Sequence, residues 1–268
     1  MFQEVDDLKA EGAALHSLLA TLDAHDWERP TPFKQWTPWD VVAHLHLSDQ
    51  WAVAALQGRD AFTQSITPLL LAMNARTSMR DYTRSHFRAL PGAAILDSWR
   101  QCFDDLNSRL AAVDPKARLA WFGPDMGARS FVTARYMETW AHGQDIYDLL
   151  GRPRVYTDSI RAIATLGVKT YGFTFNNRRQ PVPSPEPYVR LTAPSGAIWE
   201  WNPPSDTDRI EGLASEFCHV VTQGRNIADT ALTVTGEPAR QWMAIAQCFA
   251  GPPETPPAPG SRMIPGAR

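Results

Sequence analysis

The sequence predicts an α+β protein. A helical bundle is expected over residues 1–155, a smaller α+β domain over residues 156–250, and a disordered tail over residues 251–268. Apolar residues recur at helical spacing through the first of these segments. Short alternating stretches, which are typical of strands, appear only in the second. The third is rich in proline and poor in apolar residues, a composition that does not support a packed core.

Five helices are expected in the bundle, over residues 6–22, 37–58, 69–90, 93–113 and 128–151. The second has Thr37 as a suitable N-cap, Pro38 at its first helical position and Gly58 near its end. Gly151 is placed to end the fifth helix as its C-cap residue. Long helices with short connections favour a bundle.

The second domain is expected to mix both kinds of element. Its helices are predicted over residues 159–173, 208–224 and 237–251, and its strands over residues 188–194, 197–201 and 229–236. The first two strands flank Ser195 and Gly196, a pair that favours a turn. The prolines before the first strand mark an irregular crossover.

The composition excludes several classes of protein. Lys and Arg total 26 against 29 Asp and Glu, so the charge gives no reason to expect nucleic acid or an anionic membrane as a partner. The acidic N-terminus lacks the features of a signal peptide, and no apolar run is long enough to span a bilayer. The three cysteines lie far apart without metal-type spacing. A cytoplasmic protein with reduced cysteines is expected.

A helical wheel of the second helix selects one of its two histidines for the interior. His44 shares a face with Val41, Leu45 and Trp51, whereas His46 lies on the opposite side. His44 is therefore the candidate for a buried site. Trp51, on the same face, is a candidate pocket wall that binds substrate, with simple core packing as the alternative.

The fifth helix carries an unusual polar face. Its wheel places Arg135, Glu138, His142 and Asp145 on one side together with apolar residues. A carboxylate inside a bundle is costly unless it is paired or binds a metal. Glu138 and His142, four residues apart, project side by side, so they and His44 form a candidate site for a divalent ion that keeps an open position.

Each of these residues also has an alternative role. A single core histidine is commonly just hydrogen-bonded, and the Glu138–His142 spacing is common on solvated faces. Asp145 is a candidate to orient His142 or Arg135 from behind the site, or to cap or pair with Arg135 alone. Arg135 is a candidate substrate contact, with a buried ion pair to Glu138 as the alternative.

The motifs WTPWDVVAHL and METWAHGQDIYDLLG together resemble the DinB-like superfamily, and more closely the mycothiol-dependent maleylpyruvate isomerase family of actinobacteria. The longer run WFGPDMGARSFVTARYMETWAHGQDI is similar to a metal-binding branch of that family without an assigned reaction. The resemblance implies a four-helix-type bundle followed by an α+β domain. It also implies His44, Glu138 and His142 as ligands of a divalent ion, most often zinc. It matches Arg225 to a basic residue that binds the anionic substrate, with an ordinary surface arginine as the alternative.

These features predict a metal-dependent enzyme that uses a low-molecular-weight thiol such as mycothiol for isomerisation or S-transfer on a small electrophile. An open position on zinc lowers the pKa of a bound thiol, and no cysteine of the chain is close in sequence to the ligands. Two alternatives remain: a thiol-independent hydrolase, lyase or cyclase of a secondary metabolite, and a non-catalytic protein stapled by its metal. Ni²⁺, Fe²⁺ and Mn²⁺ also suit the ligand set. A monomer or homodimer is expected.

Overall fold

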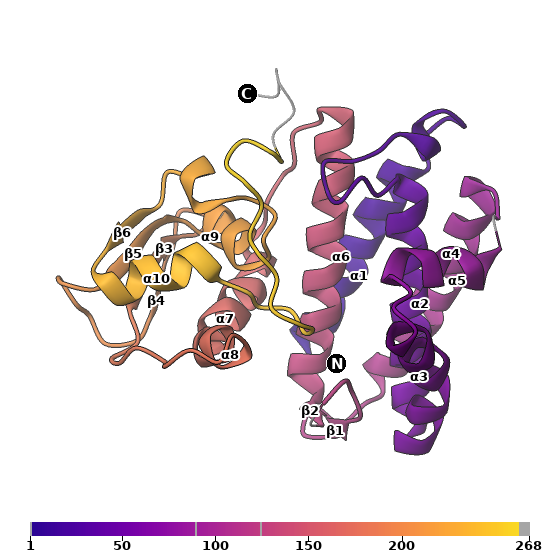
Figure 1. Ribbon diagram of the computed structural model, residues 1–268, viewed down its shortest axis with the longest axis horizontal. Helices are drawn as coiled ribbons and strands as arrows, with labels where there is room; N and C mark the ends of the chain where they lie inside the picture. The colour runs from indigo at the N-terminus through magenta and orange to yellow at the C-terminus, as the bar shows by residue number, and fades with distance from the viewer. Residues whose placement is uncertain (1, 89, 124, 263–268) are drawn as a thin grey trace. The chain divides into compact units, whose positions relative to one another are not determined.

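The computed structural model describes residues 2–88, 90–123 and 125–262. The chain divides into two compact units, Met1–Leu150 and Gly151–Arg268, which are described separately (Figure 1). This boundary lies a few residues before the one that the sequence predicts. The expected fold class is confirmed: a helical first unit is followed by a smaller unit of helices and strands.

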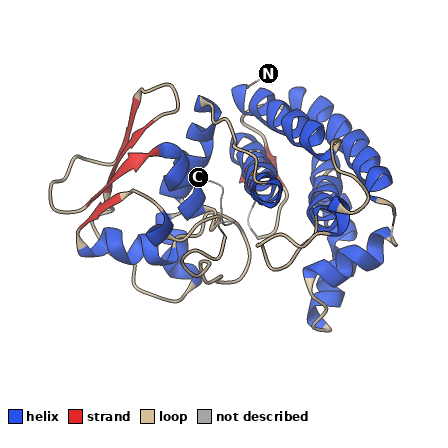
Figure 2. Cartoon of the chain, turned by 90° about the horizontal axis from the view of Figure 1, so that it is seen from above, coloured by secondary structure: helices blue, strands red, loops and turns tan. Residues whose placement is uncertain are grey.

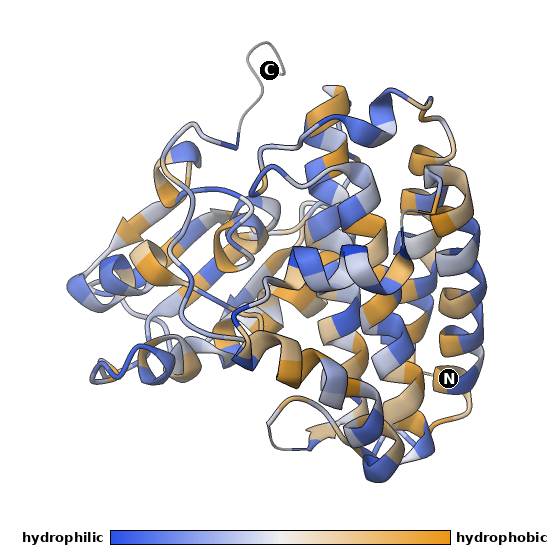
Figure 3. Cartoon of the chain, turned by 45° about the vertical axis from the view of Figure 1, so that its right-hand side comes forward, coloured by the Kyte–Doolittle hydropathy of each residue, from blue (hydrophilic) through white to orange (hydrophobic). Residues whose placement is uncertain are grey.

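Four long helices form the bundle of the first unit: α1 (Gln3–Leu19), α2 (Pro38–Gln57), α5 (Gly92–Ala111) and α6 (Ala128–Leu150). Both α1 and α2 pack against α5 and α6, so each helix has two neighbours in a four-membered ring. Hydrophobic and hydrophilic residues alternate around these helices (Figure 3). The apolar stripes form a core in which the largest side chains, among them Trp99, Trp140 and Phe103, are almost completely buried.

The prediction of one helix over residues 69–90 is wrong. The structure has α3 (Arg59–Asn74) and α4 (Met79–Phe87) in its place. Arg76 between them has a φ of 64°, which ends α3, and the Ser78 side chain accepts the Asp81 N–H as the N-cap of α4. Helix α3 continues through Pro68, the residue that obscured its earlier start in the sequence. The loop before α6 also contains a short antiparallel hairpin, whose strands β1 (Arg118–Leu119) and β2 (Met126–Gly127) have two residues each.

The start of α2, which fixes the position of His44, is firmly anchored. Thr37 and Asp40 form a capping box, in which each side chain accepts a hydrogen bond from the other residue's backbone N–H. The Asp40 carboxylate also accepts hydrogen bonds from Arg80 and Arg84 of α4. The first turn of α2 is therefore held both by its own capping box and by helix α4.

The second unit has a four-stranded sheet in the order β4-β3-β5-β6. Its strands are β3 (Tyr188–Thr192), β4 (Ile198–Trp201), β5 (Arg209–Leu213) and β6 (Thr233–Thr235). The strands are drawn in red in Figure 2. β3 pairs parallel with β5, and the other neighbours are antiparallel. The helices of this unit are α7 (Arg161–Lys169), α8 (Tyr171–Asn177), α9 (Ala214–Val221) and α10 (Glu237–Ile245). Short 3-10 helices lie at Asp158–Ile160 and Ile227–Asp229 in this unit, and at Asp26–Glu28 in the first unit.

Three helix predictions in this unit differ from the structure. The expected helix over residues 237–251 ends earlier, because α10 stops at Ile245. The expected helix over residues 208–224 begins with strand β5, because Ile210 pairs with Val189 on one side and Val234 on the other. Its apolar spacing fits either element, and sheet pairing decides. The expected helix over residues 159–173 is divided at Thr170 into α7 and α8.

The described part of the tail, up to residue 262, forms hydrogen bonds with the second unit. Side chains of the second unit donate to its carbonyl groups: Gln223 and Arg178 to Glu254, and Asn226 to Pro257. Carbonyls are the only backbone hydrogen-bonding groups of proline, so a Pro-rich segment is suited to such donors. Residues 263–268 lie outside the described residues, and their expected disorder stays a prediction.

The described helices include none with the combination of length and hydropathy that crossing a bilayer requires.

Candidate metal centre

Two neighbouring helices bring the three predicted ligands together. His44 extends from α2, and Glu138 and His142 extend from α6. The Nε2 atoms of His44 and His142 lie 3.5 and 3.6 Å from the same oxygen, Oε2 of Glu138. Each residue offers one ligand atom, and these atoms all lie within 4.8 Å of one another.

These separations fit a shared divalent ion better than direct hydrogen bonds. A nitrogen–oxygen hydrogen bond is usually about 2.7–3.2 Å long, so 3.5 and 3.6 Å are long for that contact. Two ligands at about 2.1 Å from one tetrahedral ion are roughly 3.4 Å apart. Two imidazoles and one carboxylate are also a donor set that zinc and neighbouring divalent ions accept. The residues present therefore fit a metal ion.

The protonation of the site also suits a metal. Burial raises the pKa of Glu138, but the neighbouring His44, His142 and Arg135 side chains outweigh it and hold the pKa at about 2. Burial lowers the pKa of His44 more than Glu138 raises it. Glu138 is thus ionised and His44 neutral at neutral pH, as metal ligation requires. The side chains of His44, Glu138 and His142 are 15, 25 and 11% exposed, so each is in partial contact with solvent.

Asp145 lies behind the imidazole of His142, as the sequence predicts for an orienting carboxylate. Its Oδ2 is 3.4 Å from Nδ1 of His142, on the ring edge away from Glu138. A carboxylate in this position favours the tautomer with the proton on Nδ1, because the N–H group then faces its negative charge. The Nε2 lone pair of His142 is then directed toward Glu138 and available to an ion.

Arg135 pairs with Asp49 of α2, a partner that the sequence analysis did not identify. Its Nε donates to Oδ1 of Asp49 over 3.0 Å, and Nε1 of Trp99 in α5 donates to the other oxygen over 3.0 Å. The Arg135 side chain is 3% exposed. Arg135 therefore pairs with Asp49 and not with Glu138 or Asp145, the partners that the sequence analysis expected. A guanidinium buried to this extent does not fit the predicted contact with substrate. The available signal was Asp49 itself, a carboxylate directly after Ser48 on the inner face of α2.

His46 and Trp51 of α2 lie on the faces of the helix that the helical wheel predicts. His46 faces away from His44 and stacks on Phe87 of α4, with ring centroids 4.8 Å apart. Trp51 is 3% exposed and packs edge-on against Phe122. The core-packing alternative therefore accounts for Trp51 better than the predicted pocket wall.

Two aromatic residues beside the imidazoles were missed. Trp36 lies parallel to His142 at a centroid distance of 5.7 Å and meets His44 at 64° and 5.4 Å. Phe33 meets His142 edge-on at 5.0 Å. The available signal was the position of Trp36 directly before the N-cap Thr37, where an apolar residue packs back onto the helix.

Arg225 lies in the second unit, directly after the turn that follows α9. Its backbone N–H donates to the carbonyl of His219, and its guanidinium donates to the carbonyl of Gly224. Burial, followed by the charge of Arg225, lowers the pKa of His219. The predicted contact of Arg225 with an anionic substrate stays a prediction.

The comparisons with known proteins place the chain in a family. The model of the mycothiol maleylpyruvate isomerase N-terminal domain matches residues 8–147. Uncharacterized proteins from two strains of Mycobacterium tuberculosis are 40% identical over 252 residues, which cover 93% of this chain and 96% of theirs.

Among solved structures, the mycothiol-dependent maleylpyruvate isomerase and a histidine-to-alanine mutant of it match with a TM-score of 0.52. Sequence identity is 14% and 13%, over 81% of this chain and 87% of theirs, so this match supports the fold alone. The family resemblance expected from the helix-two and helix-five motifs is confirmed. The chain belongs to the family defined by the mycothiol maleylpyruvate isomerase N-terminal domain.

Proposed function

We propose that the chain is a metal-dependent enzyme that uses mycothiol or a related low-molecular-weight thiol to isomerise, or to transfer sulfur to, a small electrophile. The ligands are His44, Glu138 and His142, and zinc is the expected ion. The observation that carries the proposal is the approach of both Nε2 atoms to one Glu138 oxygen, at 3.5 and 3.6 Å. Membership of the family supports the use of a thiol.

His44, Glu138 and His142 would hold the ion, and a metal bound by these three side chains would lower the pKa of a thiol and so supply a thiolate at neutral pH. The partial exposure of all three side chains gives such a thiol access. Asp145 keeps the proton of His142 on Nδ1, so that Nε2 stays free for ligation. Because a structural site is closed by four protein ligands, three partly exposed ligands favour catalysis over a metal staple.

Two of the chain's three cysteines, Cys102 and Cys218, are poor candidates for the nucleophile. Burial, with the charges of Asp49 and Asp105, raises the pKa of Cys102 to about 12. Burial also raises the pKa of Cys218 well above its usual value. The thiolate form, which is the reactive one, is therefore negligible for both at neutral pH. This favours a thiol supplied from solution.

The proposed isomerisation conserves the thiol. The sulfur adds to one carbon of a conjugated double bond, the resulting single bond rotates, and elimination restores the double bond in the other geometry and releases the thiol. In sulfur transfer the adduct takes up a proton and leaves with the sulfur attached. We propose that Arg225 binds an anionic group of the substrate, as the family resemblance implies.

Elemental analysis of the purified protein tests the metal, with about one equivalent expected. His44→Ala is expected to remove it, whereas His46→Phe, on the same helix but outside the site, should retain it. Maleylpyruvate, the substrate in the name of the similar structure, is the first probe for activity, assayed with and without mycothiol. Full metal content in His44→Ala would contradict the ligand assignment. Turnover of an electrophile without any thiol would contradict the thiol mechanism.

A further inference from the structure

The two candidate imidazole ligands are oriented by different means. His142 has Asp145 behind its Nδ1 atom. His44 has no equivalent, because its Nδ1 atom is buried and has no hydrogen-bond partner among the described residues. Metal-binding histidines almost always use that second nitrogen to fix the ring. Something else must therefore hold the His44 ring in position.

The aromatic ring of Trp36 occupies the place to do so. It is 8% exposed, and it contacts both imidazoles at once, parallel to His142 and inclined at 64° to His44. The two imidazole centroids are 4.8 Å apart. Phe33 closes on His142 from another direction, at 74°. The imidazoles are thus packed against two rings that come from one short segment before α2.

The backbone of this segment is an unusual tight turn. Lys34 and Gln35 both have positive φ, 46° and 58°, and the Trp36 N–H donates to the Phe33 carbonyl over 2.8 Å. Two successive positive φ values define a type I′ turn, which favours Asn-Gly. Neither residue here is Asn or Gly. Strained backbone of this kind persists only where the surroundings impose it, and it gathers at functional sites.

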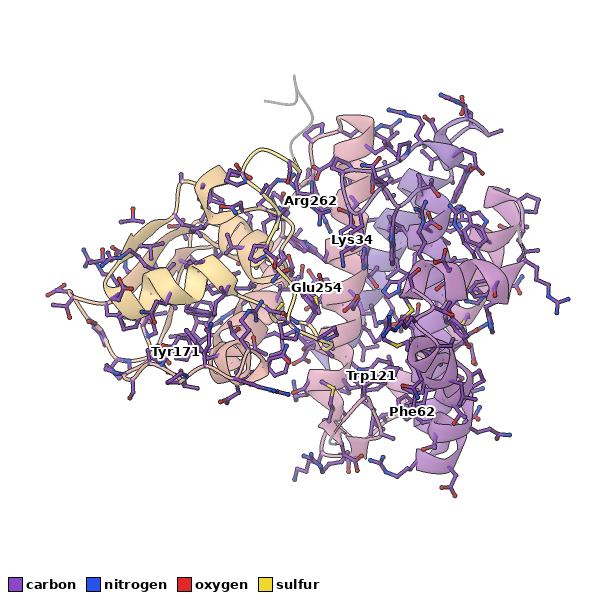
Figure 4. The ribbon with its side chains drawn as sticks, viewed as in Figure 1. Lys34, Phe62, Trp121, Tyr171, Glu254 and Arg262 are labelled. Carbon is purple, nitrogen blue, oxygen red and sulfur yellow. The ribbon has the colours of Figure 1, made fainter. Side chains whose placement is uncertain are left out.

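Both ends of the turn are fixed. On one side the Thr31 N–H donates to the Trp36 carbonyl over 2.7 Å, and Thr31 is completely buried. On the other side Thr37 begins the capping box with Asp40. The two central residues of the turn are exposed at its outer surface, where the Lys34 ammonium lies 5.5 Å from the centroid of the Phe33 ring (Lys34 is labelled in Figure 4).

We propose that Trp36 is a positioning residue of the metal centre, held by the strained turn at Lys34 and Gln35. Its indole ring fixes the imidazole of His44, which lacks a hydrogen bond on Nδ1, in the orientation that ligation requires. Phe33 supports His142 in the same way. The inference rests on the proposed metal site and adds residues that set the affinity of that site for its ion.

Co²⁺ binding to the metal-free full chain tests the proposal, measured as a Kd by competition with a chromophoric chelator and as a d–d absorption spectrum. Trp36→Leu should weaken binding by about tenfold or more and shift the spectrum, as loss of an orienting partner does. Trp36→Phe, which keeps an aromatic ring, should recover most of the affinity. Trp27→Leu is the matched control, because Trp27 is equally buried but packs on Gly92 of α5.

A second pair of variants acts through the backbone alone. Gln35→Gly suits the positive φ at this exposed position, and Gln35→Val opposes it. We expect Gln35→Val to weaken Co²⁺ binding and Gln35→Gly to leave it unchanged or tighter. Far-UV circular dichroism confirms that each variant is folded, and the Gln35 pair decides the matter if Trp36→Leu does not fold.

The outcomes separate the two proposals. Co²⁺ binding by the wild type that is unchanged in Trp36→Leu and Gln35→Val would overturn the role of the turn and leave the metal site intact. Equal weakening in Trp27→Leu would also overturn it, since general destabilisation would then account for the effect. A wild-type protein that binds no Co²⁺ would overturn the proposed function and this inference with it.

Discussion

Arg135 and Asp49 form an ion pair in the interior of the helical unit, with 2.9 Å between a terminal guanidinium nitrogen and Oδ1. The pair joins α6 to α2, the two helices that carry the candidate ligands. Arg135 precedes Glu138 by one helical turn, so the brace lies close to the site. Trp99 of α5 donates to the same carboxylate and extends the contact to a third helix.

Removal of one member of this pair should be more damaging than removal of both. Arg135→Met leaves the Asp49 carboxylate buried without its counter-charge, a change that costs about 3–5 kcal/mol of unfolding free energy. Arg135→Met combined with Asp49→Leu removes both charges and should recover most of that loss. Urea unfolding of the metal-free proteins measures the difference. As a control, the exposed pair of Arg109 and Asp105 should contribute about 0–1 kcal/mol. Equal stability of the single and double variants would contradict the prediction.

Local signals in the sequence predict most of the helical unit. The expected ranges 37–58, 93–113 and 128–151 agree with α2, α5 and α6 to within about two residues, because proline and glycine mark their ends. The break between α3 and α4 carries no such mark. It depends on Arg76 in a left-handed conformation and on Ser78 as a cap, neither of which stands out from the sequence around it.

Helix periodicity also placed His44 on the inner face of one helix and Glu138 and His142 together on one face of another, but it did not identify the residues that contact them. The partner of Arg135 is on another helix, so spacing along α6 favoured Glu138 or Asp145 instead. The turn before α2 was hidden for a different reason. Lys34 and Gln35 lack the Asn-Gly signature of its backbone conformation, and only the fold imposes that conformation on them. The metal assignment itself stays a prediction.

Replacement of the carboxylate behind His142 should weaken metal binding while the three ligands remain. Asp145→Asn removes the charge that favours the Nδ1 proton of His142, 3.4 Å away. Loss of such a partner typically reduces metal affinity about 10–100-fold. Chelator competition with Zn²⁺ measures the change. The matched control is Asp105→Asn, at an exposed position on α5, which should keep the wild-type Kd. Identical Kd values for Asp145→Asn and the wild type would exclude an orienting role.

His46 gives the fold a dependence on pH that is separate from the metal site. Burial, with a smaller effect of His86, lowers the pKa of His46 from 6.5 to about 4. Between these values the unfolded chain binds a proton that the folded protein does not. The free energy of unfolding therefore falls as the pH decreases from 6.5 toward 4. Above pH 6.5 both states are neutral and this contribution to stability is fully present.

His46→Phe should remove that part of the pH dependence, because phenylalanine keeps the stacking on Phe87 but does not titrate. Between pH 7 and pH 4.5 we expect the variant to lose about 2 kcal/mol less of its unfolding free energy than the wild type. Urea unfolding with a chelator present at both pH values measures this difference without any contribution from metal binding. His25→Phe, which replaces an exposed histidine, should retain the wild-type pH dependence. If His46→Phe and the wild type lose the same amount of unfolding free energy between these pH values, the pKa of His46 is not lowered in the folded protein. A lowered pKa of His46 is the only source of the difference that we expect between the two proteins.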